Sequence, residues 1–126
     1  MIVIDTSVLI DGLSGAKLSA PAIRDAIAEG EEILLPALVL YEWLRGPRLS
    51  EELALQESLF PSKSAVSFDK EQAKVSADLY RSVRRARTRE VDLAIAACAL
   101  VHEARLWTLN RADFRDVPGI RLYGPG

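Results

Sequence analysis

The chain contains very few soft metal ligands, with one cysteine and one histidine among its 126 residues. A single cysteine, Cys98, cannot form an internal disulfide. Together with His102 it provides too few ligands for a structural zinc site and does not form a Cys/His nucleophilic pair of the usual kind. The two residues lie four apart in an alanine-rich run, which favours a packed helix core. We therefore exclude zinc chemistry and thiol catalysis.

Long hydrophobic runs and a positive net charge are also lacking. The longest apolar run, LAIAACALV at 93–101, is far shorter than the ~20 residues that span a bilayer. No basic region precedes the apolar N-terminus, and the net charge of −2 gives no overall field that attracts nucleic acid. We expect a soluble, cytoplasmic protein without a membrane partner. The hydrophobic content of 49% predicts one globular domain over residues 1–126.

Short apolar runs alternate with helical patterns along the chain. The expected strands cover residues 2–4, 31–35, 65–68, 106–108 and 120–123. The expected helices begin after Asp5 and then cover 20–28, 36–44, 50–59, a long segment from Asp69 past Val83, 89–103 and 110–115. This alternation predicts an α/β fold with a parallel sheet.

Four carboxylates stand out as candidate site residues, and three of them lie at the edge of apolar runs or inside them. The four residues are Asp5, Glu42, Asp92 and Asp113. An ionised acid in such a place is costly unless a cation or hydrogen bonds compensate it. Asp5 follows the first strand and Asp113 follows the fourth, and ligands of open parallel sheets bind beyond the carboxyl ends of the strands. The acids therefore predict a metal site. Hard carboxylate oxygens favour Mg²⁺ or Mn²⁺.

Each acid also has a structural alternative, either capping a helix or pairing with an arginine. These alternatives are the N-cap of the first helix for Asp5, a reciprocal cap with Asn110 for Asp113, an ion pair with Arg45 for Glu42 and an ion pair with Arg89 for Asp92. Trp43, next to Glu42, is interpreted as a packing residue.

The order of four motifs resembles the PIN domain family. The motifs are DTSVLID from Asp5, YEWLRG from Tyr41, VDLAIAACAL from Val91 and TLNRADF from Thr108, and the resemblance covers Ile2 to about Leu122. The small size is similar to that of VapC-type ribonuclease toxins. The resemblance implies a three-layer α/β/α fold with a five-stranded parallel sheet in the order 3-2-1-4-5.

The resemblance also implies a function and a set of site residues. Asp5, Glu42, Asp92 and Asp113 would bind Mg²⁺ or Mn²⁺ and catalyse RNA cleavage, with Thr6, Ser7 and Asn110 as polar supports. The protein would be the toxin of a toxin–antitoxin pair, with RNA and a small cognate antitoxin as partners, and we expect a homodimer.

Where the family often has a glycine-containing loop before the third acid, this chain has RRARTRE at 84–90. Its position just before Asp92 predicts that Arg85, Arg87 and Arg89 contact the RNA backbone, since arginine suits bidentate phosphate contacts. The alternative is a solvated helix end.

Two other functions remain as alternatives. One is a PIN-like module that binds RNA or protein without catalysis. The other, less favoured, is an aspartyl phosphotransferase with Asp5 as the nucleophile. The haloacid-dehalogenase-like version of this chemistry needs a second aspartate where the chain has Ser7, and receiver domains need a late lysine, whereas the last lysine here is Lys74.

Overall fold

The computed structural model describes residues 1–124 and has a three-stranded parallel sheet at its centre. The strands are β1 (Ile2–Ile4), β2 (Ile33–Leu34) and β3 (Arg105–Trp107), in the order β2-β1-β3. All of β1 is buried, since its residues are apolar and strands pair with both of its edges. The register sets Ile4 opposite Trp107, so the residues that follow these two strands leave the sheet side by side.

Helices form most of the remaining structure. Within residues 1–124 the α-helices are α1 (Thr6–Leu13), α2 (Ala20–Ala28), α3 (Ala37–Arg45), α4 (Ser50–Leu59), α5 (Lys70–Ser82) and α6 (Glu90–Val101). Short 3-10 helices are η1 (Ser62–Ser64), η2 (Ala86–Thr88) and η3 (Arg111–Phe114). Every helix expected from the sequence is present, although the last one is the 3-10 helix η3.

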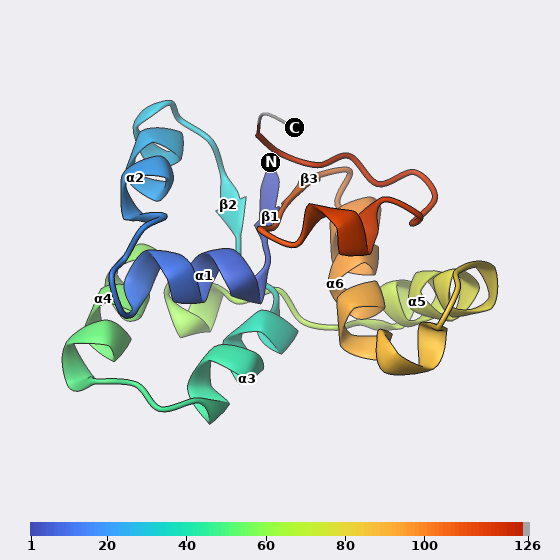
Figure 1. Cartoon of the computed structure of the whole chain (residues 1–126), viewed down its shortest axis with the longest axis horizontal. Coiled ribbons are helices and arrows are strands. Elements are labelled where there is room, and N and C mark those ends of the chain that lie inside the picture. Colours follow the sequence, from blue (N-terminus) through green and yellow to red (C-terminus); the bar gives the residue numbers. More distant parts are fainter. Residues whose placement is uncertain (125–126) are drawn as a thin grey trace.

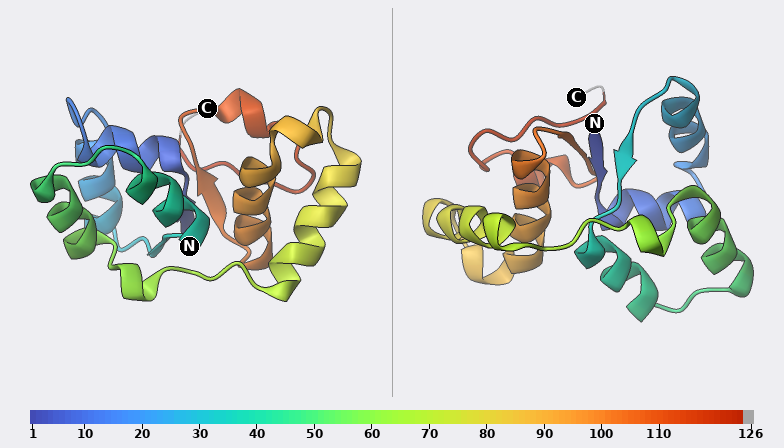
Figure 2. Two further views of the ribbon diagram at one scale, coloured as in Figure 1. Left: turned by 90° about the horizontal axis from the view of Figure 1, so that it is seen from below. Right: turned by 180° about the vertical axis from the view of Figure 1, so that it is seen from behind.

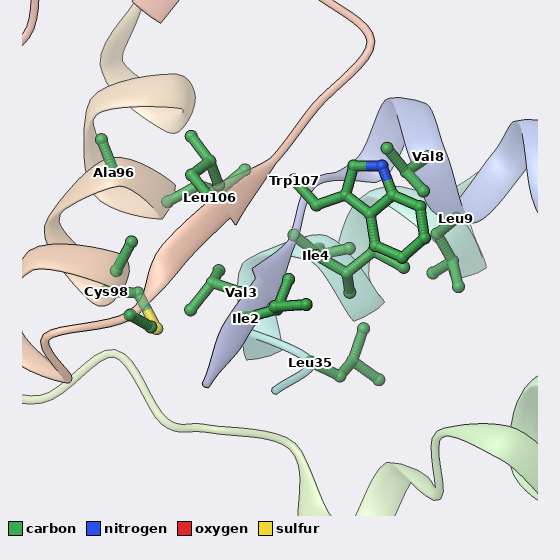
Figure 3. Packing of buried hydrophobic residues seen from close by; sticks show 14 of the residues in the cluster. Ile2, Val3, Ile4, Val8, Leu9, Leu35, Ala96, Cys98, Leu106 and Trp107 are labelled. Atoms are coloured by element: carbon green, nitrogen blue, oxygen red, sulfur yellow. The ribbon is translucent and has the colours of Figure 1, made fainter. Parts of the chain in front are cut away.

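The helices cover both faces of the sheet. Helices α5 and α6 lie on one side, and α1 to α4 lie on the other (Figures 1 and 2). In Figure 3, Ala96 and Cys98 of α6 approach the sheet from one side, and Val8 and Leu9 of α1 approach from the other. The predicted layers of an α/β fold with a parallel sheet are therefore confirmed.

The prediction of a five-stranded sheet is wrong for residues 1–124, which form three strands. The segments expected as the third and fifth strands each form a single parallel bridge, Pro36 with Val66 and Leu106 with Leu122. These bridges place the segments beside β2 and β3, where the order 3-2-1-4-5 requires them. Proline has no N–H and α3 begins at the next residue, so the first ladder cannot continue.

The second short pairing lies close to a turn. Gly119 has a φ of 79°, and Gly124 has a φ of 96°, so left-handed backbone bounds the extended segment on both sides.

None of the helices in residues 1–124 combines the length and the apolar character needed to cross a bilayer.

Candidate active site

Asp5 is the first residue after β1, and the sheet register fixes its neighbour. Its backbone N–H donates to the Trp107 carbonyl at 2.9 Å, which places it beside Thr108, the residue after β3. The Thr108 hydroxyl donates to Asp5 Oδ2 at 2.7 Å, and the Ser7 hydroxyl donates to the same oxygen at 2.9 Å. Asp5 is 4% exposed, and two hydroxyl groups therefore orient its buried carboxylate.

The capping role considered for Asp5 is not formed. Asp5 occupies the N-cap position of α1, but its side chain makes no capping hydrogen bond. Ser7, an expected support, contacts the carboxylate instead. Thr108 is a supporting residue that the sequence reasoning missed. Its signal was available, since it is the last residue of the strand expected at 106–108, which the order 3-2-1-4-5 places beside the first strand.

Glu42 lies in α3, which packs against α1. Thr6 begins α1 and donates its hydroxyl hydrogen to Glu42 Oε1 at 2.5 Å. The ion pair considered for Glu42 is present but long, with Arg45 Nη2 3.4 Å from Oε2, and the Arg45 side chain is 57% exposed. Such a pair contributes little because water screens it. Thr6 thus fixes the orientation of Glu42 more firmly than Arg45 does.

Asp92 lies in the first turn of α6, directly before the buried stretch of that helix. Burial raises the pKa of its carboxyl from 3.8 to about 6, and the negative charges of Asp5, Glu42 and Asp113 add to the rise, whereas Arg89 opposes it. The four acids are therefore near enough for their charges to interact. No salt bridge joins Asp92 to Arg89 within residues 1–124, so the ion pair considered for Asp92 is not formed.

Asp113 lies in η3 and is exposed. The reciprocal cap considered for it is absent, because the Asn110 side chain makes no capping hydrogen bond. Asn110 contributes backbone groups instead: its N–H donates to the Thr108 hydroxyl at 3.0 Å, and its carbonyl accepts from the Asp113 N–H at 3.0 Å. Asn110 thus connects the end of β3 to the turn that carries Asp113.

Two hollows meet at Asp92, and arginines line both of them. One hollow is bordered by Arg84, Arg85, Thr88, Arg89, Asp92, Ala112, Asp113 and Asp116. The other is bordered by Glu42, Arg87, Thr88, Arg89, Glu90, Val91 and Asp92. With volumes of about 420 and 330 Å³, each is large enough to admit a phosphate group. Arg85 and Arg87 are exposed and border different hollows, both of which include Asp92.

Arg89 differs from the other arginines of this segment because protein groups bind it. Its guanidinium forms a two-pronged ion pair with Asp116, at 2.8 and 2.7 Å. It also donates to the backbone carbonyls of Arg84 at 2.9 Å and Asp113 at 2.7 Å. Asp116 was not among the residues predicted from the sequence.

The donor set suits a hard divalent cation, although the acids do not enclose one. Among residues 1–124, no three acidic, histidine or cysteine side chains are close enough together to hold a metal ion as they stand. Mg²⁺ keeps several of its waters and needs one or two carboxylates, so a complete protein shell is not required. Like charges that repel one another in a partly desolvated site are a further reason for a cation to bind there.

Two residues set aside from the site on sequence grounds lie in the core. Cys98 is 1% exposed, and burial raises the pKa of its thiol to about 11, so the thiolate form that binds metals is disfavoured. Trp43 is fully buried beneath the Arg48 guanidinium, which lies 4.2 Å from its ring centre, so it cannot stack on a base. Both interpretations as packing residues are confirmed.

Comparisons with known proteins agree with this geometry. The family model of the PIN domain matches residues 2–120. Ribonuclease VapC19 of Mycobacterium tuberculosis is 36% identical over 124 residues, covering 96% of this chain and 98% of the relative. VapBC2 from Rickettsia felis, solved bound to a promoter DNA fragment, matches with a TM-score of 0.75 at 17% identity and full coverage of both chains.

A toxin–antitoxin complex from Klebsiella pneumoniae matches with a TM-score of 0.64 at 19% identity over 95% of each chain. At such identities the two structures are evidence of a shared fold. The family model and the relative at 36% identity carry the assignment further, since each spans nearly the whole chain. The resemblance seen in the four sequence motifs is confirmed, and the chain belongs to the PIN domain family.

Proposed function

We propose that the protein is a Mg²⁺- or Mn²⁺-dependent endoribonuclease and the toxin of a toxin–antitoxin pair. The observation that carries this proposal is the environment of Asp92, whose pKa is raised by burial and by Asp5, Glu42 and Asp113. A nuclease that uses divalent cations needs such a group of acids. The identity to Ribonuclease VapC19 over nearly the full length supports RNA as the substrate.

The chain's own residues prepare the site for this chemistry. Asp5, Glu42, Asp92 and Asp113 would hold the ion, which when bound supplies the Lewis acidity for in-line attack of water on a phosphodiester. The hydroxyl groups of Ser7 and Thr108 fix the Asp5 carboxylate, and that of Thr6 fixes Glu42. Orientation by such hydrogen bonds keeps ligands in place before the cation arrives.

RNA cleavage by the purified protein tests the proposal. Single-stranded RNA should be cut in Mn²⁺, left intact with excess chelator, and cut again when Mn²⁺ is restored. Persistent inactivity towards varied RNAs, together with retained RNA binding, would favour the module without catalysis. The phosphotransfer alternative predicts instead a covalent phosphate on Asp5, which mass spectrometry detects.

Arg85 and Arg87 should each bind a phosphate next to the acidic site. Each side chain is exposed and lines a hollow that reaches Asp92. Replacing both by alanine should weaken RNA binding and reduce the slope of log affinity against log salt by about 0.7 for each lost phosphate contact. Fluorescence anisotropy with labelled single-stranded RNA at several salt concentrations measures this slope.

A matched control removes the same charge elsewhere. Lys70 and Lys74 are exposed in the first turns of α5, whereas the arginines follow the other end of that helix. Changing both lysines to alanine should leave the slope close to that of the wild type. Equal slopes for the arginine variant and the wild type would mean that Arg85 and Arg87 are solvated surface residues that do not contact RNA.

The partners of the site follow from its charge and its surroundings. A small antitoxin can silence an acidic site by presenting an arginine to the carboxylates. Accessible apolar side chains lie near the acids along the chain, including Tyr41 and Leu44 of α3 and Leu109 after β3. We expect a cytoplasmic homodimer that co-purifies with the product of an adjacent antitoxin-like reading frame when the two are expressed together.

A further inference from the structure

Arg89 lies where three segments meet near the acids. It is the residue before α6, and its guanidinium reaches the Arg84 carbonyl after α5 and the Asp113 carbonyl in η3. The ion pair with Asp116 spans 27 residues of sequence. The Arg89 side chain is 16% exposed and that of Asp116 is 46% exposed, so the arginine is held within the fold while its partner reaches the surface.

The hydrogen bonds of Arg89 leave little capacity for another ligand. A guanidinium has five N–H donors. Nη1 donates to Arg84 and Asp116, and Nη2 donates to Asp113 and Asp116, which uses all four terminal N–H groups. Only the Nε hydrogen is left, and it cannot provide a bidentate phosphate contact alone. The expectation that Arg89 contacts the RNA backbone therefore does not fit its geometry.

The segment that carries Asp113 needs an external support. η3 has four residues and is a 3-10 helix, whose hydrogen-bond geometry is poorer than that of an α-helix. Buried Phe114 anchors one side of it. On the other side, the Asp113 carbonyl accepts the hydrogen bond from Arg89, and Asp116 holds that same arginine. Removing the pair would free the turn that places Asp113 in the same hollow as Asp92.

We propose that Arg89 and Asp116 form a clamp that positions Asp113 for metal binding beside Asp92, without touching RNA. This inference rests on the proposed function, because it assigns Arg89 to the positioning of a ligand in the same site. The hydrogen bond between the two side chains raises the pKa of Arg89 and lowers the pKa of Asp116. Both directions favour the charged forms that make up the ion pair.

Arg89→Lys is the most informative variant because it keeps the charge and loses the two-pronged geometry. We expect kcat for RNA cleavage to fall by roughly 10- to 100-fold, and Mn²⁺ affinity measured by calorimetry to fall by about 10-fold or more. KM should change by less than about twofold, since no RNA contact is lost. Asp116→Asn should have the same effects, and the double variant should be little worse than either single one.

Glu31→Gln is the matched control. Glu31 pairs with Arg105 at the start of β3, at the opposite end of the strands from the acids, and both side chains are partly exposed. This variant should keep kcat and Mn²⁺ affinity within about twofold of the wild type. All assays are run well below the melting temperatures, so that loss of folded protein does not imitate a loss of kcat.

Other results would overturn the clamp. A raised KM with a flatter salt dependence in Arg89→Lys would show an RNA contact. Unchanged kcat and Mn²⁺ affinity in both single variants, with a lower melting temperature, would show a purely structural ion pair. Wild-type protein that binds Mn²⁺ but never cleaves RNA would refute the ribonuclease, and the calorimetric comparison would still decide the clamp.

Discussion

Without metal at pH 7, Asp92→Asn should be more stable than the wild type by about 1–2 kcal/mol. The pKa of Asp92 is raised to about 6 in the folded protein, from an ordinary value of 3.8. Between those values the folded protein keeps a proton that the unfolded chain has released. Wild-type stability therefore falls as the pH rises from about 4 to about 6, and asparagine removes this loss.

Urea unfolding at pH 4 and pH 7 with a chelator present measures the effect. The difference between the variant and the wild type should be much smaller at pH 4, where Asp92 is protonated in the folded protein. Asp25→Asn is a suitable control, because Asp25 is exposed in α2. A variant destabilised by several kcal/mol at pH 7 would mean that a cationic partner compensates Asp92, contrary to the repulsion described above.

Mn²⁺ should raise the stability of the wild type by about 2.7 kcal/mol at a concentration one hundred times the dissociation constant. For a chain of this length that gain corresponds to a rise in melting temperature of roughly 10 °C. The gain arises because the ion binds the folded acids and relieves their repulsion. If Asp92→Asn weakens binding about tenfold or more, its gain at the same concentration should be smaller by at least about 1.3 kcal/mol.

A thermal shift series in Mn²⁺ measures both gains, again with Asp25→Asn as the control. That control should match the wild type, since the charge it loses lies in α2 on the other side of the sheet from α6 (Figure 1). Equal gains for the wild type and Asp92→Asn would mean that the ion binds away from Asp92. If none of the proteins gains stability, the folded chain does not bind Mn²⁺ and the proposed metal site is wrong.

The sequence was most informative where local pattern and sheet geometry act together. Asp5 was identifiable because a buried parallel strand ends at Ile4, and its meeting with the segment after β3 follows from the pairing of these strands. The helices were predictable from the spacing of apolar residues and from helix-terminating residues such as Gly46 and Pro47. Asp92 stood out because its helix is otherwise apolar.

What the sequence could not provide depends on contacts between distant segments. Arg89 looked like its neighbours Arg85 and Arg87, and only the folded chain brings Asp116 to it from 27 residues away. The sequence also did not show how short the third and fifth strands are. A single Pro36 at the start of α3 reduces the third strand to one bridge, and no periodicity in the sequence reports that competition.

The most direct test of the account is Mn²⁺-dependent cleavage of one single-stranded RNA by the wild type, Asp92→Asn and Asp25→Asn. We predict that Asp92→Asn remains folded but that its kcat is about 100-fold or more below the wild type, because a ligand of the ion is lost. Asp25→Asn should cleave at the wild-type rate. Cleavage by Asp92→Asn at the wild-type rate and with the wild-type dependence on Mn²⁺ would contradict the assignment of the acidic cluster as the catalytic metal site.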